Sequence, residues 1–418
     1  MRLKRNQLFL RVWVAGGPLM DRKPSRHTCS AVLSCSFVIA LLAVMPNIAM
    51  AQQSPISRSK IAVMDPVTLN QHFRALGFKV RGGVARSKSE SSSNNLRSLP
   101  HFSSAFAIGG VVYPYTMLGY APPSGRTAHL RSVIVPLRMK FMYFGPNSDV
   151  NVDFDPRDAV KNIVNSPMYQ DAQFPNGVGQ FADLMQRVTF WNKMDPERQW
   201  HVRMAPPQVM PTIDIEVTPE TGSLFRDSEG NFFGNVLIDF LDSQARTILQ
   251  LTSIDSDEVP IFVTQNVTAE ALGYHSAFSI SKGDGSEALQ TMIYTSWLDP
   301  RLVDPLLADV STFNHEEAEW INDPFINNVV PDWKYPPPTD PRAVCSGNPL
   351  LEVGDPQGNG ATYDDFPTVV ITIKGVGYHL QQLVMLPWFA DERPSSAENG
   401  WYTFPAPESL TVPAVYCR

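Results

Sequence analysis

The sequence predicts an α+β fold in which a mixed, largely antiparallel sheet lies over one helix that carries an HExxE motif. After about residue 101, short β-branched and aromatic runs alternate with turn residues, which is the pattern of strands. The 36 prolines among 418 residues favour short strands and ordered loops over a helical bundle. Strand patterns also directly precede the motif helix. The length allows one large domain or two ordinary ones, with an ample core.

Residues 1–51 have the pattern of an export signal. Basic residues precede an apolar stretch from Ala31 to Val44, and Ala49 and Ala51 supply the small residues of a cleavage site. The apolar stretch is too short to span a membrane. We therefore expect a protein exported to the periplasm or the extracellular space, with no membrane attachment after cleavage.

Residues 52–100 are rich in serine and other polar residues, and such a composition buries too little apolar surface to offset its ordering entropy. We predict a disordered linker or pro-segment here, which leaves residues 101–418 as the folded domain. Two cysteines, Cys345 and Cys417, remain after the signal is lost. An oxidising compartment favours a disulfide between them over two free thiols.

Within the domain, period-two patterns and helical patterns alternate. Helices are predicted over residues 158–165 and 179–187. Strands are predicted over residues 107–117, 132–144, 212–217, 235–241, 247–251, 259–264, 274–280 and 289–297. A further helix is predicted from about Pro305, where Asp304 at the N-cap precedes a proline at the first helical position. It should extend to Asn322 and stop at Asp323-Pro324, because the residue before a proline avoids the α region.

This last helix contains His315-Glu316-Glu317-Ala318-Glu319. At about 100° per residue, Glu319 falls roughly 40° and Glu316 about 100° from His315, with the apolar residues on the opposite arc. A His and a carboxylate four residues apart can bind one metal ion, and the Glu after the His can take a proton from a metal-bound water. The alternative is a solvated acidic face that contains one His. Glu317 falls on the apolar side, for which the pattern offers no account.

A catalytic zinc site needs a third protein ligand and one position open to water. Glu352, in the turn LLEVGD, is the first choice; Asp355 is the second and His379 the third. Glu352 and Asp355 could equally be solvated turn acids, and His379 a core histidine. His379, or Tyr378 beside it, could instead stabilise the oxyanion of a transition state, which makes His379 a candidate catalytic residue together with Glu316.

His275, in LGYHSAF, falls in a predicted strand near the motif helix. It could orient one of the metal ligands, but we expect it to be a histidine packed in the core. The sequence contains neither a Gly-rich phosphate loop nor a Gly-x-Ser-x-Gly elbow.

The segments STFNHEEAEWINDPF, PDW, NPLLEVGDPQGN, YHLQQLVMLPWFA and NGWYTF together resemble a group of uncharacterised secreted bacterial proteins. VIVPLRMKF, ALGYHSAF and SPMYQDAQF also resemble that group, so the likeness covers most of residues 101–418. Secreted proteins with an HExxExxxDP motif resemble zincins, in which two strands precede the active-site helix and an edge strand binds the substrate backbone. The resemblance implies a zincin-like, metallopeptidase-like fold.

The glutamate at position 319 replaces the second histidine of the better-known HExxH helix. A site of His315, Glu319 and Glu352 has one imidazole and two carboxylates, and hence more negative charge around the ion. The ion becomes a weaker Lewis acid, and harder cations such as Mn²⁺ or Ca²⁺ compete with Zn²⁺.

We therefore expect an exported, monomeric, zinc-dependent metallopeptidase that acts on a protein or peptide. The alternative is a secreted or cell-surface binding protein without catalysis. Its aromatic residues Trp333, Trp388 and Trp401, with Tyr335 and Tyr402, could form a binding patch, although we expect most of them to pack in the core. Hydrolysis of another amide, such as one in the cell wall, is a third reading. A net charge of −7 and the absence of a basic block in the domain argue against a nucleic-acid partner.

Overall fold

The computed structural model describes residues 99–195, 199–226, 230–252, 254–281, 287–302, 307–335, 345–358, 368–394, 400–405 and 410–417. The predicted signal, and the predicted linker up to residue 98, lie outside the described residues. The fold is mixed α+β, with many strands and few helices, as the sequence predicts.

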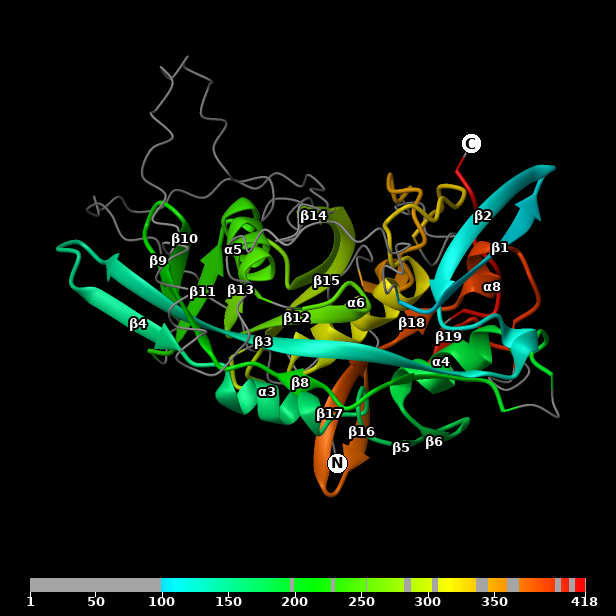
Figure 1. Cartoon of the computed structure of the whole chain (residues 1–418), viewed down its shortest axis with the longest axis horizontal. Coiled ribbons are helices and arrows are strands. Elements are labelled where there is room, and N and C mark those ends of the chain that lie inside the picture. The colour runs from blue at the N-terminus through cyan, green and yellow to red at the C-terminus, as the bar shows by residue number, and fades with distance from the viewer. Residues whose placement is uncertain are drawn as a thin grey trace, which may run out of the picture. The chain divides into compact units, whose positions relative to one another are not determined.

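A sheet of eight strands forms the centre of the fold (Figure 1). Its main path runs in the order β14-β15-β12-β3-β4, and β7, β8 and β9 pair with successive parts of the long strand β3. The bounds are β3 Thr127–Phe144, β4 Val150–Phe154, β7 His201–Met204, β8 Gln208–Val209, β9 Ile213–Val217, β12 Glu258–Gln265, β14 Gly273–Ser281 and β15 Glu287–Trp297.

Strand direction varies within this sheet. β12 pairs in parallel with both β15 and β3, whereas β14 is antiparallel to β15 and β4 is antiparallel to β3. The smaller sheets are mostly antiparallel hairpins, so the sheets taken together are largely antiparallel while the large one is mixed. β14 is an edge strand, since no described strand pairs with its other side.

The smaller sheets surround this centre. β1 (His101–Ile108) pairs with β2 (Val111–Leu118), β5 (Ala172–Phe174) with β6 (Gly177–Gly179), β16 (Thr368–Ile373) with β17 (Val376–Gln381), and β18 (Leu383–Val384) with β19 (Thr403–Phe404). A three-stranded sheet contains β10 (Gly222–Arg226), β11 (Phe232–Val236) and β13 (Val267–Thr268).

The helices are short, except for α5 and α6. They are η1 (Pro122–Ser124), α3 (Arg157–Val164), α4 (Phe181–Thr189), α5 (Ile238–Leu251), α6 (Ser311–Asn322), α7 (Asp355–Gly358) and α8 (Leu386–Phe389). Across the described ranges, none of the helices has the length and apolar character needed to cross a membrane.

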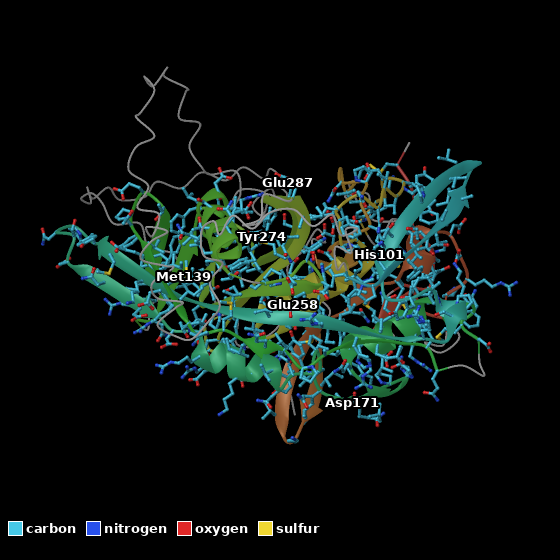
Figure 2. All side chains as sticks on the ribbon, in the orientation of Figure 1. His101, Met139, Asp171, Glu258, Tyr274 and Glu287 are labelled. Carbon is cyan, nitrogen blue, oxygen red and sulfur yellow. A yellow bond between two sulfur atoms is a disulfide. The ribbon has the colours of Figure 1, made fainter. Side chains whose placement is uncertain are left out.

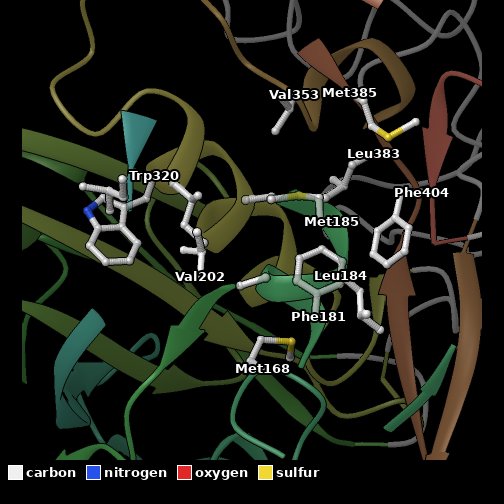
Figure 3. Packing of buried hydrophobic residues seen from close by; sticks show 14 of the residues in the cluster. Met168, Phe181, Leu184, Met185, Val202, Trp320, Val353, Leu383, Met385 and Phe404 are labelled. Carbon is white, nitrogen blue, oxygen red and sulfur yellow. The ribbon is translucent and has the colours of Figure 1, made fainter. Parts of the chain in front are cut away.

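Side-chain alternation along the central strands gives the large sheet two cores. On β15, Ile293 packs into the cluster that contains α4 and α6, whereas Met292 and Tyr294 pack into the cluster that contains α5. Neighbouring residues of a strand point to opposite faces, which explains the division. The sheet therefore carries α5 on one face and α6 on the other. Figure 3 shows part of the α4–α6 cluster, in which Phe181 faces Phe404, with ring centres 5.7 Å apart.

Two predicted strands, 235–241 and 247–251, are wrong over most of their length. β11 ends at Val236, and residues Ile238–Leu251 form helix α5. The buried residues of α5 are Phe240, Leu241, Gln244, Ala245, Ile248 and Leu249, which is a helical period of three to four. The short apolar runs within this period resemble strands when they are read separately.

The predicted disulfide is present. Cys345 and Cys417 are bonded across 72 residues of sequence. Trp333 and Trp388 lie in the core, with relative exposures of 0% and 2%, which confirms core packing for these two residues over a surface patch. Trp401 is half-buried.

Candidate metal centre

Helix α6 carries the HExxE motif and is buried on nearly all sides. The predicted start at Asp304 and Pro305 lies outside the described residues. The helix begins at Ser311, because Asp309 forms a bridge with Leu298 at the end of β15 and adopts a positive φ of 44°. It ends at Asn322 as predicted. Asp323 follows as the C-cap, and its carboxylate accepts hydrogen bonds from the amides of residues 327 and 328.

The edge strand β14 lies close against α6. A Cβ atom at Gly273 would lie 2.7 Å from Cγ2 of Thr312 and 2.8 Å from Cγ of Glu316, so only glycine permits this approach. Figure 2 labels Tyr274 on β14, whose hydroxyl donates to Asp242 of α5. Tyr274 points to the α5 face, and His275 therefore points to the α6 face of the sheet.

The imidazole of His315 is held in one orientation by Gln381 of β17. Oε1 of Gln381 accepts from Nδ1 of His315 at 2.8 Å, while Nε2 of Gln381 donates to the carbonyl of Gly354 at 2.8 Å. The main chain of Gln381 is itself fixed by two hydrogen bonds with the side chain of Asn314. Because Nδ1 donates to Gln381, Nε2 is the nitrogen that would bind a metal ion. Without a metal, the carboxylate of Glu319 beside Nε2 outweighs burial and raises the pKa of His315 well above its usual value.

Nε2 of His315 faces two carboxylates. It lies 3.1 Å from Oε1 of Glu319 and 3.8 Å from Oδ1 of Asp355. The amide of Gly354 donates to the same Oε1 of Glu319 at 3.1 Å. A Cβ at Gly354 would lie 2.4 Å from Nδ1 of His315, so the turn can approach the ring only with glycine at this position.

The segment around Glu352 is held by main-chain bonds on both sides. The amide of Leu351 donates to the carbonyl of Asn328, and the carbonyl of Val353 accepts from the amide of Val384. Leu351 and Val353 point into the core, with relative exposures of 0% and 1%. The side chain of Glu352 between them is directed to the other side, where it meets His275.

His275 lies among three glutamates. Its Nδ1 is 3.5 Å from Oε2 of Glu316 and 3.6 Å from Oε2 of Glu319, and its Nε2 is 3.9 Å from Oε2 of Glu352. These separations exceed the usual hydrogen-bond length of about 2.7–3.2 Å. Nε2 of His275 and Oε2 of Glu352 are both buried without a hydrogen-bond partner. A buried polar atom without a partner is costly, so the arrangement needs a further group.

A divalent cation fits this need. Two donors that share one cation at about 2.1 Å lie roughly 3.0 Å apart at a right angle and about 4.2 Å apart at a straight angle. From Nε2 of His315, the separations of 3.1 Å to Glu319 and 3.8 Å to Asp355 fall within this span. The 3.9 Å between Nε2 of His275 and Glu352 falls within it as well. Imidazoles and carboxylates are also the ligands that Zn²⁺ and Mn²⁺ accept.

Burial and mutual charge shift the pKa values of the whole group. Burial and the charge of Glu319 raise the pKa of Glu352 to about 9 and that of Asp355 to about 7. Burial lowers the pKa of His275, but the carboxylates of Glu316, Glu352 and Glu319 outweigh it and raise the value to about 9. Without a cation, protons therefore compensate the negative charge. Bound metal would displace them, as metal binding commonly does.

The pKa values of Glu319 and Glu316 shift in opposite directions, although both residues belong to the same group of donors. Burial raises the pKa of Glu316, and the neighbouring histidines offset this only in part. For Glu319, His315 and His275 outweigh burial and lower the pKa. Glu319 is therefore the carboxylate most firmly ionised, which suits a ligand. A carboxyl with a raised pKa, such as that of Glu316, suits proton transfer.

The structure brings together most of the residues that the sequence singled out. His315, Glu316 and Glu319 form one group of donors within 4.8 Å of one another, and Glu319 and Glu352 form a second with His275. The preference for His275 as a core histidine is wrong, since its ring reaches three acids of the site. A histidine at an alternate position of an edge strand just before the motif is the signal that could have identified it.

His379 lies elsewhere among the described contacts. Its Nδ1 pairs with Asp309 at 2.6 Å, before the first turn of α6, and no described contact joins it to the donors above. Gln381, two residues further on the same face of β17, is the residue that contacts His315. Sequence reasoning missed Gln381 because a glutamine carries no ligand signal of its own.

Glu317 is completely buried on the apolar side of α6, and neither of its oxygens has a hydrogen-bond partner among the described residues. Burial raises its pKa well above the usual value and so favours the neutral form of the side chain. Nothing in the structure explains why a glutamate occupies this position.

Comparisons with protein-family models, curated proteins and solved structures returned no match for this chain.

Proposed function

We propose that this chain is a metal-dependent hydrolase with a zincin-like arrangement, and that it cleaves peptide bonds. The observation that carries the proposal is the orientation of His315. Gln381 accepts a hydrogen bond from Nδ1 of the ring, and Nε2 lies 3.1 Å from Oε1 of Glu319 on the same helix face. Metal-ligating histidines commonly have such a partner on the second ring nitrogen, and it sets which nitrogen faces the ion.

In this proposal His315 and Glu319 hold the cation. Asp355, rather than the first-choice ligand Glu352, supplies the third donor, because Asp355 is the carboxylate of the turn that lies next to Nε2 of His315. A bound divalent cation supplies Lewis acidity and makes a water molecule more acidic. Zn²⁺ is the leading candidate, while the carboxylate-rich donor set also accepts harder cations such as Mn²⁺.

Glu316 is the general base and acid of the proposed reaction. Its carboxylate takes a proton from the attacking water as the new C–O bond forms, and passes it to the amine as the C–N bond breaks. His275 lies 3.5 Å from the same carboxylate, and its charge lowers the pKa of Glu316 against the effect of burial. His379 has no part in this scheme, since it pairs with Asp309.

The edge strand β14 favours a peptide as the substrate. It lies against α6 and carries His275 into the site, and on the described residues its outer edge is unpaired. An extended peptide can add to such an edge through main-chain hydrogen bonds, which would run the scissile bond past the site. The Cys345–Cys417 disulfide supports export to an oxidising compartment.

The test is hydrolysis of casein by the purified chain, with and without a chelator. We expect activity that the chelator abolishes and Zn²⁺ or Mn²⁺ restores. Glu316→Gln should lose at least about 100-fold in kcat while it keeps its metal, since general acid–base catalysis contributes 10²–10⁴-fold. Glu216→Gln, at an exposed acid of β9, is the control and should keep full activity.

Two outcomes would count against the proposal. Activity that persists in the metal-free protein would exclude a metal mechanism. Stoichiometric metal without hydrolysis of casein, of shorter peptides or of cell-wall amides would instead favour a binding protein that keeps a structural metal.

A further inference from the structure

The donors around α6 fall into two groups that share one residue. The first contains His315, Glu316 and Glu319, and the second contains His275, Glu319 and Glu352, each within 4.8 Å. Glu319 presents a different oxygen to each histidine. Oε1 lies 3.1 Å from Nε2 of His315, whereas Oε2 lies 3.6 Å from Nδ1 of His275. One ring nitrogen of His275 lies within 4.8 Å of both Glu319 and Glu352, so a single nitrogen can serve a shared ion.

A carboxylate with one oxygen towards each of two donor groups has the arrangement of a bridging ligand. In two-metal hydrolases the ions lie about 3.5–4 Å apart, a distance that one carboxylate can bridge. A single ion between His315 and Glu319 would leave Nε2 of His275 and Oε2 of Glu352 without partners. Those two atoms belong to the second group and lie 3.9 Å apart, which fits two ligands of one further ion.

The charge of the carboxylates around α6 also indicates two ions. Glu316, Glu319, Glu352 and Asp355 carry four negative charges when ionised. The three glutamates have relative exposures of 4% to 6%, so water compensates little of this charge. One divalent cation would leave two negative charges in a buried site, whereas two cations neutralise it. Buried charges are stable only when they are paired or coordinate metals.

We propose that the chain binds two divalent cations, with Glu319 as the bridge between one ion at His315 and Asp355 and a second at His275 and Glu352. The second ion rests on the proposed hydrolase site, because both share Glu319. In the dinuclear site His275 is a metal ligand. The edge strand β14 then contributes directly to the metal centre.

The first experiment is metal analysis of the untagged chain after equilibration with Mn²⁺ and removal of free ions. We expect two equivalents of Mn²⁺ per chain. Electron paramagnetic resonance of the same sample should show the multiline signal of a coupled Mn²⁺ pair, which tests the proposal without any variant. One equivalent with a six-line signal would overturn the second ion and leave the proposed hydrolase site intact. No bound metal would overturn both.

Variants locate the second ion. His275→Ala and Glu352→Gln should each reduce the content from two equivalents to one, with the coupled signal replaced by six lines. His201→Ala is the matched control. This half-buried histidine pairs with a buried aspartate outside the centre, and its variant should keep two equivalents. Two equivalents in a folded His275→Ala protein would overturn the assignment of this residue.

Discussion

Replacement of Gly354 by alanine tests the centre without removal of any ligand. The added Cβ would lie 2.4 Å from Nδ1, 2.5 Å from Cε1 and 2.7 Å from Cγ of His315. Ordinary contacts need about 3.5 Å or more, so the ring must move by roughly 1 Å. The movement strains the hydrogen bond from Nδ1 of His315 to Gln381, which is 2.8 Å long. We expect overpacking and strain to cost about 1–3 kcal/mol of stability.

The Gly354→Ala variant should also bind metal more weakly, an effect that a clash elsewhere in the core would not produce. Loss of the residue that orients a metal-bound histidine typically costs about 10–100-fold in affinity, and a displaced ring has the same effect. We therefore expect Gly354→Ala to weaken Zn²⁺ binding by that factor, measured by competition with a chromophoric chelator. Thermal unfolding should show a smaller stabilisation by Zn²⁺ than in the wild type.

Gly234→Ala is the matched control for this experiment. Its Cβ would lie 2.5 Å from Cζ of Phe141, so it introduces a similar clash against a ring in the α5 core. It should destabilise the protein by a similar amount and leave zinc affinity unchanged. Equal zinc affinity in Gly354→Ala and the wild type would refute the assignment of His315 as a ligand held by this turn.

Three other changes have defined outcomes. Joint replacement of Cys345 and Cys417 by serine should cost up to about 4 kcal/mol, measured by urea unfolding, because the disulfide closes a loop of 72 residues. Asn328→Ala should cost about 2–4 kcal/mol in the same assay, since its buried amide group bonds three backbone groups of β2 and α6. The metal-free protein should lose thermal stability from about pH 6 to pH 9, because the pKa of Glu352 is raised to about 9 and that of His275 also to about 9.

The sign of this pH effect follows from proton uptake. An acid with a raised pKa and a histidine with a raised pKa both bind more protons in the folded state, so their contribution to stability is lost as pH rises. Bound metal replaces these protons, and the metal-loaded protein should change less over the same range. A metal-free protein that gains stability towards pH 9 would contradict the charge arrangement. Unchanged urea midpoints in the other two variants would contradict their assigned roles.

The sequence could predict the features that depend on local pattern. The face shared by His315 and Glu319 follows from helix geometry, and the end of α6 follows from the proline after Asp323. The start of α6 could not be predicted, because it depends on the bridge between Asp309 and Leu298, two residues that only the folded sheet brings together. α5 was misassigned since its short apolar runs have a strand-like composition.

The donors from outside the helix show a second limit of sequence reasoning. Glu352 and Asp355 could be nominated because they lie in one acidic turn. Which of them meets His315 depends on main-chain bonds from the turn to β18 and to the residues after α6. The same limit applies to β17, where the sequence favoured His379 because its side chain is the more reactive. Gln381 is the residue whose position along the strand brings it to His315, whereas His379 pairs with Asp309.

His275 changes what the HExxE motif means for this chain. A glutamate at position 319 removes the second imidazole of an HExxH helix, which led us to expect a site with one histidine and a weak Lewis acid. The fold brings a second imidazole, that of His275 on β14, to the same glutamate. Nδ1 of His275 lies 3.6 Å from Oε2 of Glu319. Glu319 can then do what a histidine cannot, since a carboxylate bridges two ions and an imidazole at this position would bind one. We infer that glutamate in place of histidine at position 319 is the feature that makes room for a second cation. In the Mn²⁺ analysis proposed above, Glu319→His should therefore bind one equivalent per chain instead of two.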